Sequence, residues 1–129
     1  DMLLPATAIG MMSAAVLNLN NMRDMESDAL SGKKTLALRM GYRYAMVYEI
    51  VLLQLPLILM LVFMMMNGLH TQGNYYAFIF FILVFPMTAL RRKIMQTKEP
   101  KELDPYLKQV GIFTLIISVL VAFGLNYFN

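Results

Sequence analysis

The chain has 129 residues, of which 59% are hydrophobic and 15% are charged, and its mean hydropathy is +0.59. Soluble globular domains carry about 25% charged residues, so this composition is typical of a membrane protein. The lack of cysteine excludes a disulfide framework and a thiolate metal site. The net charge is +3, and the basic residues are concentrated in two segments between apolar runs. This distribution is typical of residues that set the topology of a membrane protein, and we expect no nucleic-acid partner.

Four apolar segments predict an all-α membrane protein with about four transmembrane helices. The segments lie near residues 2–20, 44–66, 73–90 and 108–127. Every lysine and arginine lies between residues 23 and 43 or between residues 91 and 108. Positive charge on alternate connections is the positive-inside pattern, so we expect both basic loops, 21–43 and 91–107, to be cytoplasmic.

Local signals predict that both loops are ordered. Gly32 is a helix stop signal after the first apolar segment and its polar extension. Thr35 can cap a short helix that ends near Gly41. In the second loop, Asp104 can cap the helix that leads into the last apolar segment. The only histidine, His70, lies in the short connection between two apolar runs, where we expect a solvated residue rather than a ligand.

Polar residues that follow the first apolar segment form the candidate site. On a continuous helix, Asn20, Asp24 and Asp28 are spaced i, i+4 and i+8, so their side chains would lie on one face, about 6 Å apart. Neighbouring carboxylates repel each other unless a cation lies between them. Mg²⁺ takes one or two carboxylates and completes its shell with water and phosphate oxygens. The pattern therefore predicts a magnesium site with these three residues as ligands, whereas Glu26 points elsewhere and is assigned to solvent or to a basic neighbour.

An isolated pair of aspartates at this position would be explained by a solvated helix end. Here several cationic residues follow within one short segment, where they would bind a diphosphate that bridges the metal. The predicted diphosphate-binding residues are Asn20, Asn21, Lys33, Lys34 and Arg39. The predicted catalytic residues are Asp24, Asp28, Lys33, Lys34 and Arg39.

Two strings in the first loop resemble a known family. Residues 20–28 read NNMRDMESD and residues 32–41 read GKKTLALRMG. They resemble the second aspartate-rich motif of the UbiA superfamily of intramembrane prenyltransferases, and are most similar to the branch that acts on 1,4-dihydroxy-2-naphthoate. Residues 103–109, LDPYLKQ, are similar to a further stretch of that branch. The resemblance implies that residues 1–129 are the C-terminal part of a nine-helix UbiA-type bundle.

The resemblance also implies a function for the parent enzyme. That enzyme would transfer a polyprenyl group from polyprenyl diphosphate to 1,4-dihydroxy-2-naphthoate in menaquinone biosynthesis, with Mg²⁺ as cofactor and with loss of the acceptor's carboxylate. It would be an integral protein of the bacterial cytoplasmic (inner) membrane, in contact with the lipid bilayer. The family's first aspartate-rich motif does not occur in these residues. We therefore expect the N-terminal half of the parent chain to be a required partner, and this portion to be inactive alone.

Other interpretations stay open. A UbiA-type enzyme could act on another aromatic acceptor. A CDP-alcohol phosphatidyltransferase would also carry membrane aspartates, but its Asp-Gly-x-x-Ala-Arg string does not occur here. A membrane transporter or structural subunit with an ion site would need polar groups near mid-membrane, for which Gln54 and Glu49 are the nearest candidates. The sequence begins at Asp1 with no signal peptide visible, and we expect a piece of a longer protein.

Overall fold

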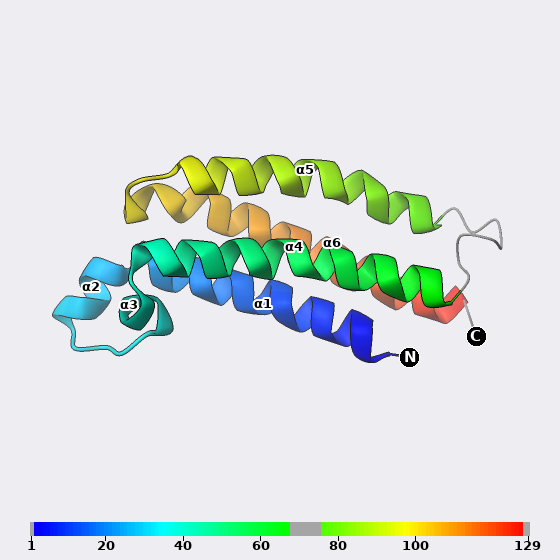
Figure 1. Cartoon of the computed structure of the whole chain (residues 1–129), viewed down its shortest axis with the longest axis horizontal. Coiled ribbons are helices and arrows are strands. Elements are labelled where there is room, and N and C mark those ends of the chain that lie inside the picture. Colours follow the sequence, from blue (N-terminus) through cyan, green and yellow to red (C-terminus); the bar gives the residue numbers. More distant parts are fainter. Residues whose placement is uncertain (1, 68–75, 128–129) are drawn as a thin grey trace.

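The computed structural model describes residues 2–67 and 76–127, and side chains within residues 2–67 and 82–122. Four long helices run side by side as a bundle (Figure 1). They are α1 (Leu3–Arg23), α4 (Tyr42–Met66), α5 (Tyr76–Gln96) and α6 (Asp104–Tyr127). Three short elements lie in the connections at one end of the bundle (Figure 1). They are α2 (Met25–Leu30), α3 (Leu36–Met40) and the 3-10 helix η1 (Pro100–Leu103).

The long helices pack around an apolar interior. Helix α1 contacts α4 and α6, and α5 packs against the same two helices. Met12, Leu53 and Ile117 are almost fully buried between them. Large apolar side chains such as Phe85 and Leu115 are exposed on the outside of the bundle. Helices that are apolar on both their inner and outer faces are typical of membrane spans.

Three helical segments in the described part of the chain are long and apolar enough to cross a membrane. They are Leu3–Arg23, Tyr42–Met66 and Pro100–Ala122. The prediction of an all-helical membrane protein is thereby confirmed. Helix α5 overlaps the predicted span at 73–90, but its last turns carry three consecutive basic residues, 91–93, so that its passage through the membrane stays a prediction. His70 lies outside the described residues.

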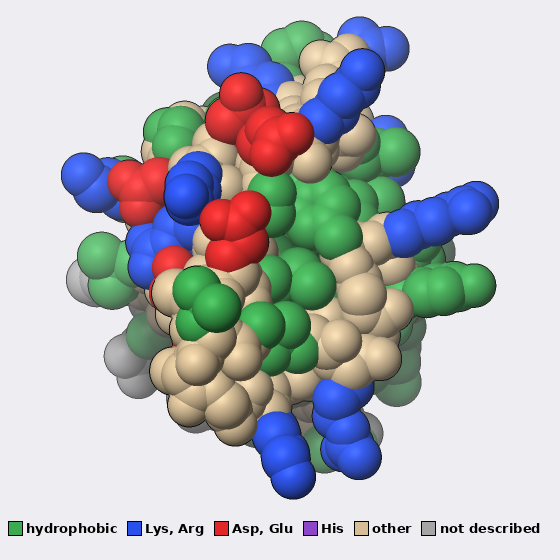
Figure 2. All heavy atoms as spheres, turned by 90° about the vertical axis from the view of Figure 1, so that its left-hand side faces the viewer, with side chains coloured by type: hydrophobic (Ala, Val, Ile, Leu, Met, Phe, Trp, Pro, Cys, Tyr) green, Lys and Arg blue, Asp and Glu red, His purple; other side chains and the backbone are tan. Residues whose placement is uncertain are grey.

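Both basic connections lie at the same end of the bundle, as the alternating charge pattern predicts (Figure 1). Figure 2 views this end and shows basic side chains around its rim, with acidic side chains gathered on one side of it. Hydrophobic side chains occupy much of the surface between them (Figure 2). One surface of the bundle therefore carries the residues of the candidate site, and its cytoplasmic location stays a prediction.

The predicted turn and cap signals of the first connection are confirmed. Helix α2 ends at Leu30, and Gly32 follows with a φ of 73°. Thr35 caps α3, because its side chain accepts a hydrogen bond from the backbone N–H of Leu38 at 3.2 Å. Gly41 joins α3 directly to α4 with a φ of 77° and a ψ of 159°, a conformation open essentially to glycine alone. These turns return the chain to the bundle beside α1.

Candidate functional site

The helix predicted to carry the aspartates without a break is interrupted at Asp24. Helix α1 ends at Arg23, Asp24 has a φ of −94° and a ψ of 8°, and α2 begins at the next residue. The interruption is mild, because the N–H of Asp24 still donates to the carbonyl of Asn20 at 3.1 Å. The N–H of Asp28 likewise donates to the carbonyl of Asp24 at 2.8 Å. The backbone keeps the predicted spacing, but the prediction of a continuous helix was wrong.

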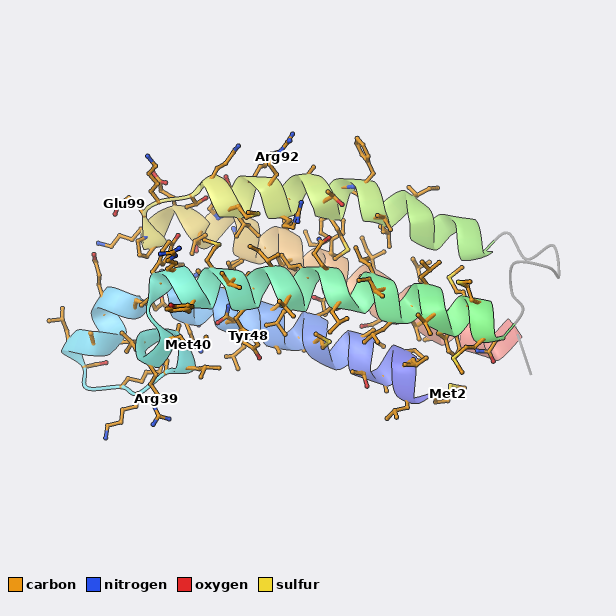
Figure 3. All side chains as sticks on the ribbon, in the orientation of Figure 1. Met2, Arg39, Met40, Tyr48, Arg92 and Glu99 are labelled. Atoms are coloured by element: carbon orange, nitrogen blue, oxygen red, sulfur yellow. The ribbon has the colours of Figure 1, made fainter. Side chains whose placement is uncertain are left out.

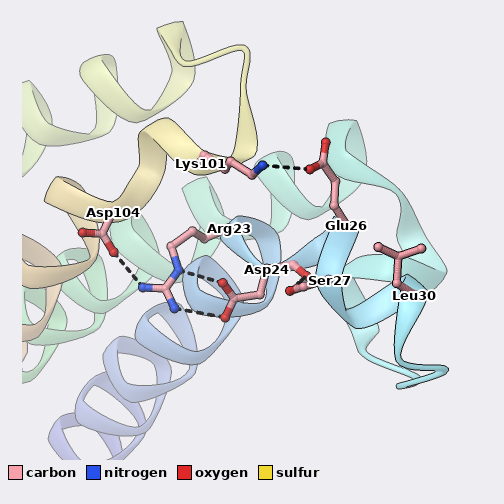
Figure 4. Close-up of a pocket in the computed structure, with 7 residues that line it drawn as sticks. All are labelled: Arg23, Asp24, Glu26, Ser27, Leu30, Lys101 and Asp104. Atoms are coloured by element: carbon pink, nitrogen blue, oxygen red, sulfur yellow. Dashed lines mark hydrogen bonds and ion pairs between the residues drawn. The ribbon is translucent and has the colours of Figure 1, made fainter.

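Arg23 gathers the side-chain oxygens of two predicted metal ligands. Its Nε and Nη2 donate to the two carboxylate oxygens of Asp24, at 2.8 and 3.0 Å. Nη2 also donates to Oδ1 of Asn20 at 2.9 Å. Nη1 donates to Oδ1 of Asp104 at 2.7 Å, so the guanidinium joins both basic connections (Figure 4). Asn20 and Asp24 are thus brought together around one cation, and their carboxylate and amide oxygens are ligands that Mg²⁺ accepts.

Asp28 belongs to a separate ion pair. It is only 6% exposed, and its two carboxylate oxygens accept from Nζ of Lys33 at 3.1 and 3.3 Å. The backbone N–H of Lys33 also donates to the carbonyl of Asp28 at 3.0 Å, which closes the turn after α2. Within the described residues, no group of three or more His, Cys, Asp or Glu side chains is placed to hold a metal ion. The role of Asp28 as a third ligand therefore stays a prediction.

The other predicted phosphate-binding residues take no part in this ion pair. Lys34 and Arg39 are exposed, and neither forms an ion pair with a described residue. Arg39 extends away from the bundle (Figure 3). Asn21 is half-buried in the last turn of α1. Of the three predicted cations, Lys33 forms an ion pair with an aspartate of the motif, and the other two have no ion-pair partner in the part of the chain that the structure describes.

The environment of Asp24 favours its ionised form. The pKa of Asp24 is lowered from its ordinary value, chiefly because Arg23 donates hydrogen bonds to its carboxylate. Partial burial acts in the opposite direction, and the charges of Arg23 and Lys33 add to the lowering of the pKa. Asp24 is therefore a carboxylate throughout the physiological pH range, which is the state that binds a cation.

A pocket of about 440 Å³ opens beside this arginine, between the two basic connections (Figure 4). Arg23 and Asp24 line one side of it, and Lys101 and Asp104 line the other. Across its mouth, Nζ of Lys101 lies 3.3 Å from a carboxylate oxygen of Glu26. The assignment of Glu26 to solvent or to a basic neighbour is confirmed, because its side chain is 66% exposed and forms this ion pair.

The contact between Arg23 and Asp104 was not predicted. Asp104 was expected to cap the last helix from outside it. Instead α6 begins at Asp104 itself, directly after η1, and the carboxylate accepts a hydrogen bond from an arginine 81 residues away. Both residues lie in strings with a family resemblance, which marks each position but gives no sign of their pairing.

A second unpredicted contact lies inside the bundle. Nδ2 of Asn18 donates to Oε2 of Glu49 at 2.8 Å and to the carbonyl of Ala45 at 3.1 Å. Glu49 is fully buried and Asn18 is 4% exposed, so this polar contact joins α1 to α4 within apolar surroundings. Asn18 lies a little more than half a helical turn before Asn20 along α1. The two polar residues stand in otherwise apolar segments, and that is the signal from which the contact could have been found.

Comparison with known proteins agrees with this picture. Residues 1–114 match the UbiA prenyltransferase family. The 1,4-dihydroxy-2-naphthoate octaprenyltransferase of Haemophilus influenzae is 36% identical over 124 residues, which cover 95% of this chain and 39% of the relative. The enzyme of the same name from Escherichia coli is 33% identical over 125 residues, which cover 96% of this chain and 39% of the relative. No solved structure matches the chain.

The chain thus spans about two fifths of the length of these relatives. The family match includes all the residues predicted for the site, from Asn20 to Arg39, and extends past Asp104. It favours the prenyltransferase interpretation over a phosphatidyltransferase, a transporter or a structural subunit. Because the match covers most of its residues, this chain belongs to the UbiA prenyltransferase family.

Proposed function

We propose that the whole protein is a Mg²⁺-dependent prenyltransferase that transfers a polyprenyl group from its diphosphate to 1,4-dihydroxy-2-naphthoate. The relatives named as octaprenyltransferases of this acceptor support the reaction. The observation that carries the proposal is the convergence of oxygens from Asn20 and Asp24 on a single cationic group at the charged end of the bundle. The proposed product is a demethylmenaquinone, formed with loss of the acceptor's carboxylate as carbon dioxide.

The same oxygens would hold the metal ion. Asn20 and Asp24 already surround a guanidinium cation, so their donor set fits a divalent cation. Asp28 follows one turn later and would contribute its carboxylate after release from Lys33. When bound, Mg²⁺ would neutralise charge on the diphosphate and thereby assist its departure.

The cationic residues of the first connection would bind the leaving group. Lys34 and Arg39 are exposed and free of ion pairs with described residues, so they can donate to diphosphate oxygens without first losing a partner. Lys33 and Asn21 would complete this set. Breakage of the allylic carbon–oxygen bond leaves a prenyl group with carbocation character, which the electron-rich ring attacks. The contribution of the protein is electrostatic stabilisation and orientation.

The proposal also includes the surroundings of the site. The charged end of the bundle would face the cytoplasm at a bacterial inner membrane, in agreement with the placement of the basic residues in the two connections at that end and in the adjoining parts of the helices. The part of the relatives that this chain does not match would supply the first aspartate-rich motif of the family resemblance. We therefore expect this portion alone to lack transferase activity.

The test is transfer of labelled octaprenyl diphosphate to 1,4-dihydroxy-2-naphthoate by the whole protein in membranes, with and without Mg²⁺. Asp24→Asn should abolish Mg²⁺-dependent transfer because it removes an anionic ligand at nearly constant size. Glu26→Gln is the matched control, since Glu26 is an exposed acidic neighbour on α2, and it should retain activity. Equal activity of Asp24→Asn and wild type would refute the metal site. Transfer to 4-hydroxybenzoate alone would keep the reaction class and replace the acceptor.

A further inference from the structure

Two ion pairs tie the second basic connection to the end of α1 and to α2. The first joins Nη1 of Arg23 to Asp104 at 2.7 Å, and the second joins Lys101 to Glu26 at 3.3 Å. The second pair is largely exposed, with side chains 83% and 66% accessible, so it contributes little. The first pair has an exposed aspartate, at 57%, but its arginine is only 27% exposed and also binds the residues proposed to hold the metal.

The hydrogen bonds of Arg23 divide its guanidinium between two carboxylates. Nε and Nη2 donate to Asp24, whereas Nη1 donates to Asp104 (Figure 4). Nη2 also donates to Asn20. A divalent cation on Asp24 would compete with this guanidinium for the same oxygens, since two positive charges at such a short distance repel. Metal binding therefore requires that Arg23 withdraw from Asp24. The free energy of that withdrawal depends on what else the arginine can bind.

We propose that Asp104 is a positioning residue for the metal site. Asp104 holds Arg23 by Nη1 and keeps the arginine paired while Asp24 exchanges the guanidinium for a metal ion. The inference rests on the proposed function, because it concerns the same site. Charge-assisted hydrogen bonds to arginine are among the stronger polar contacts, so a retained carboxylate partner offsets much of the cost of withdrawal. Without Asp104, Asp24 would be the only carboxylate among the described residues bonded to Arg23, and the metal would have to displace an arginine that has no second carboxylate partner among them.

The test compares Mg²⁺ dependence in the whole protein. Asp104→Asn should raise the Mg²⁺ concentration for half-maximal transfer by about tenfold, the low end of the effect of losing an outer partner at a metal site. The maximal rate at saturating Mg²⁺ should change little. Asp104→Glu keeps the charge and should recover most of the Mg²⁺ dependence. Glu26→Gln breaks the neighbouring exposed ion pair and should leave the Mg²⁺ dependence unchanged.

A second readout measures the cation site without turnover. Mn²⁺ binding to the purified whole protein in detergent can be followed by electron paramagnetic resonance of the free ion. We expect Asp104→Asn to weaken Mn²⁺ binding by a factor similar to its effect on Mg²⁺ dependence. A merely structural role would lower the amount of folded protein and the maximal rate, but would leave the metal affinity of the folded molecules intact.

The outcomes separate this inference from the proposed function. Unchanged Mg²⁺ dependence and unchanged Mn²⁺ binding in Asp104→Asn would overturn the positioning role, while loss of transfer in Asp24→Asn would still support the reaction. Absence of transfer in the wild type would overturn the proposed function, and the Mn²⁺ titration would still decide whether Asp104 acts on a cation site. Absence of Mn²⁺ binding to the wild type would overturn the inference.

Discussion

The buried contact between Asn18 and Glu49 gives a stability prediction that does not depend on the enzymatic reaction. Asn18 supplies the hydrogen bond to Oε2 of Glu49, while Oε1 of this fully buried carboxyl has no partner among the described residues. Asn18→Leu would leave both oxygens without a donor in an apolar interior. Leaving a buried polar group unsatisfied costs about 1–3 kcal/mol, so we expect a loss of that size in the free energy of unfolding.

Removal of both polar groups should cost less than removal of one. Asn18→Leu combined with Glu49→Met replaces the pair by apolar side chains, and such replacements are often neutral or stabilising. The double variant should therefore recover most of the stability lost by Asn18→Leu, with a coupling of at least about 1 kcal/mol between the two positions. If the hydrogen bond alone linked the two positions, the coupling between them would be smaller, because hydrogen bonds between membrane helices contribute about 0.6 kcal/mol on average.

The assay is reversible unfolding of the whole protein in mixed detergent micelles, followed by helix content. Ser118→Ala is the control, because the hydroxyl of Ser118 donates to the carbonyl of Thr114 in its own helix at 2.8 Å. Its loss leaves no buried carboxyl without a donor, and we expect little change in stability. The reasoning would be refuted if Asn18→Leu were as stable as wild type, or if the double variant were as unstable as the single one.

Three further predictions concern the first basic connection and are measured in the same unfolding assay or by Mn²⁺ binding. Thr35→Ala should destabilise the protein by about 1 kcal/mol through loss of the cap on α3. Thr35→Ser keeps the hydroxyl, so the cap and the stability should be retained. Gly41→Ala should cost about 1–3 kcal/mol, because φ 77° with ψ 159° is strained for any residue with a Cβ; an unchanged stability would contradict this. The pKa of Asp24 is lower in the folded protein than in the unfolded chain. The ionised carboxylate therefore stabilises the fold fully above the ordinary carboxyl pKa of about 3.9, and this stabilisation is lost as the pH falls through the pKa of the folded protein. Proton competition at Asp24 should therefore leave Mn²⁺ binding unchanged between about pH 8 and pH 5.5, and a steep loss within that window would refute the assignment.

Much of the fold follows from local patterns in the sequence. Three of the long helices were foreseeable because their segments are apolar over the length of a membrane span. Thr35 and Gly32 were recognised from capping and turn preferences, which depend on a few neighbouring residues. These features are local, so an inspection of the sequence is sufficient to find them.

The arrangement of the candidate site depends on contacts that are distant in sequence or that break a local rule. The side chains of Arg23 and Asp24 are adjacent in sequence and would diverge on a regular helix. Their double hydrogen bond is accompanied by the departure from helical geometry at Asp24, which helical spacing alone could not reveal. The partner of the arginine on the second connection lies 81 residues away, and no periodic pattern links the two positions.

The link between Arg23 and Asp104 has a consequence for how the sequence of this family can change. A neutral substitution at Arg23 leaves two carboxylates beside the site without this cation, and a neutral substitution at Asp104 leaves the arginine bound to Asp24 as its one carboxylate partner among the described residues. Relatives that lose the acidic residue at position 104 should therefore also replace the arginine, or provide an acidic residue from a neighbouring turn. The two loops, although separated by two long helices in the chain, would evolve as one unit.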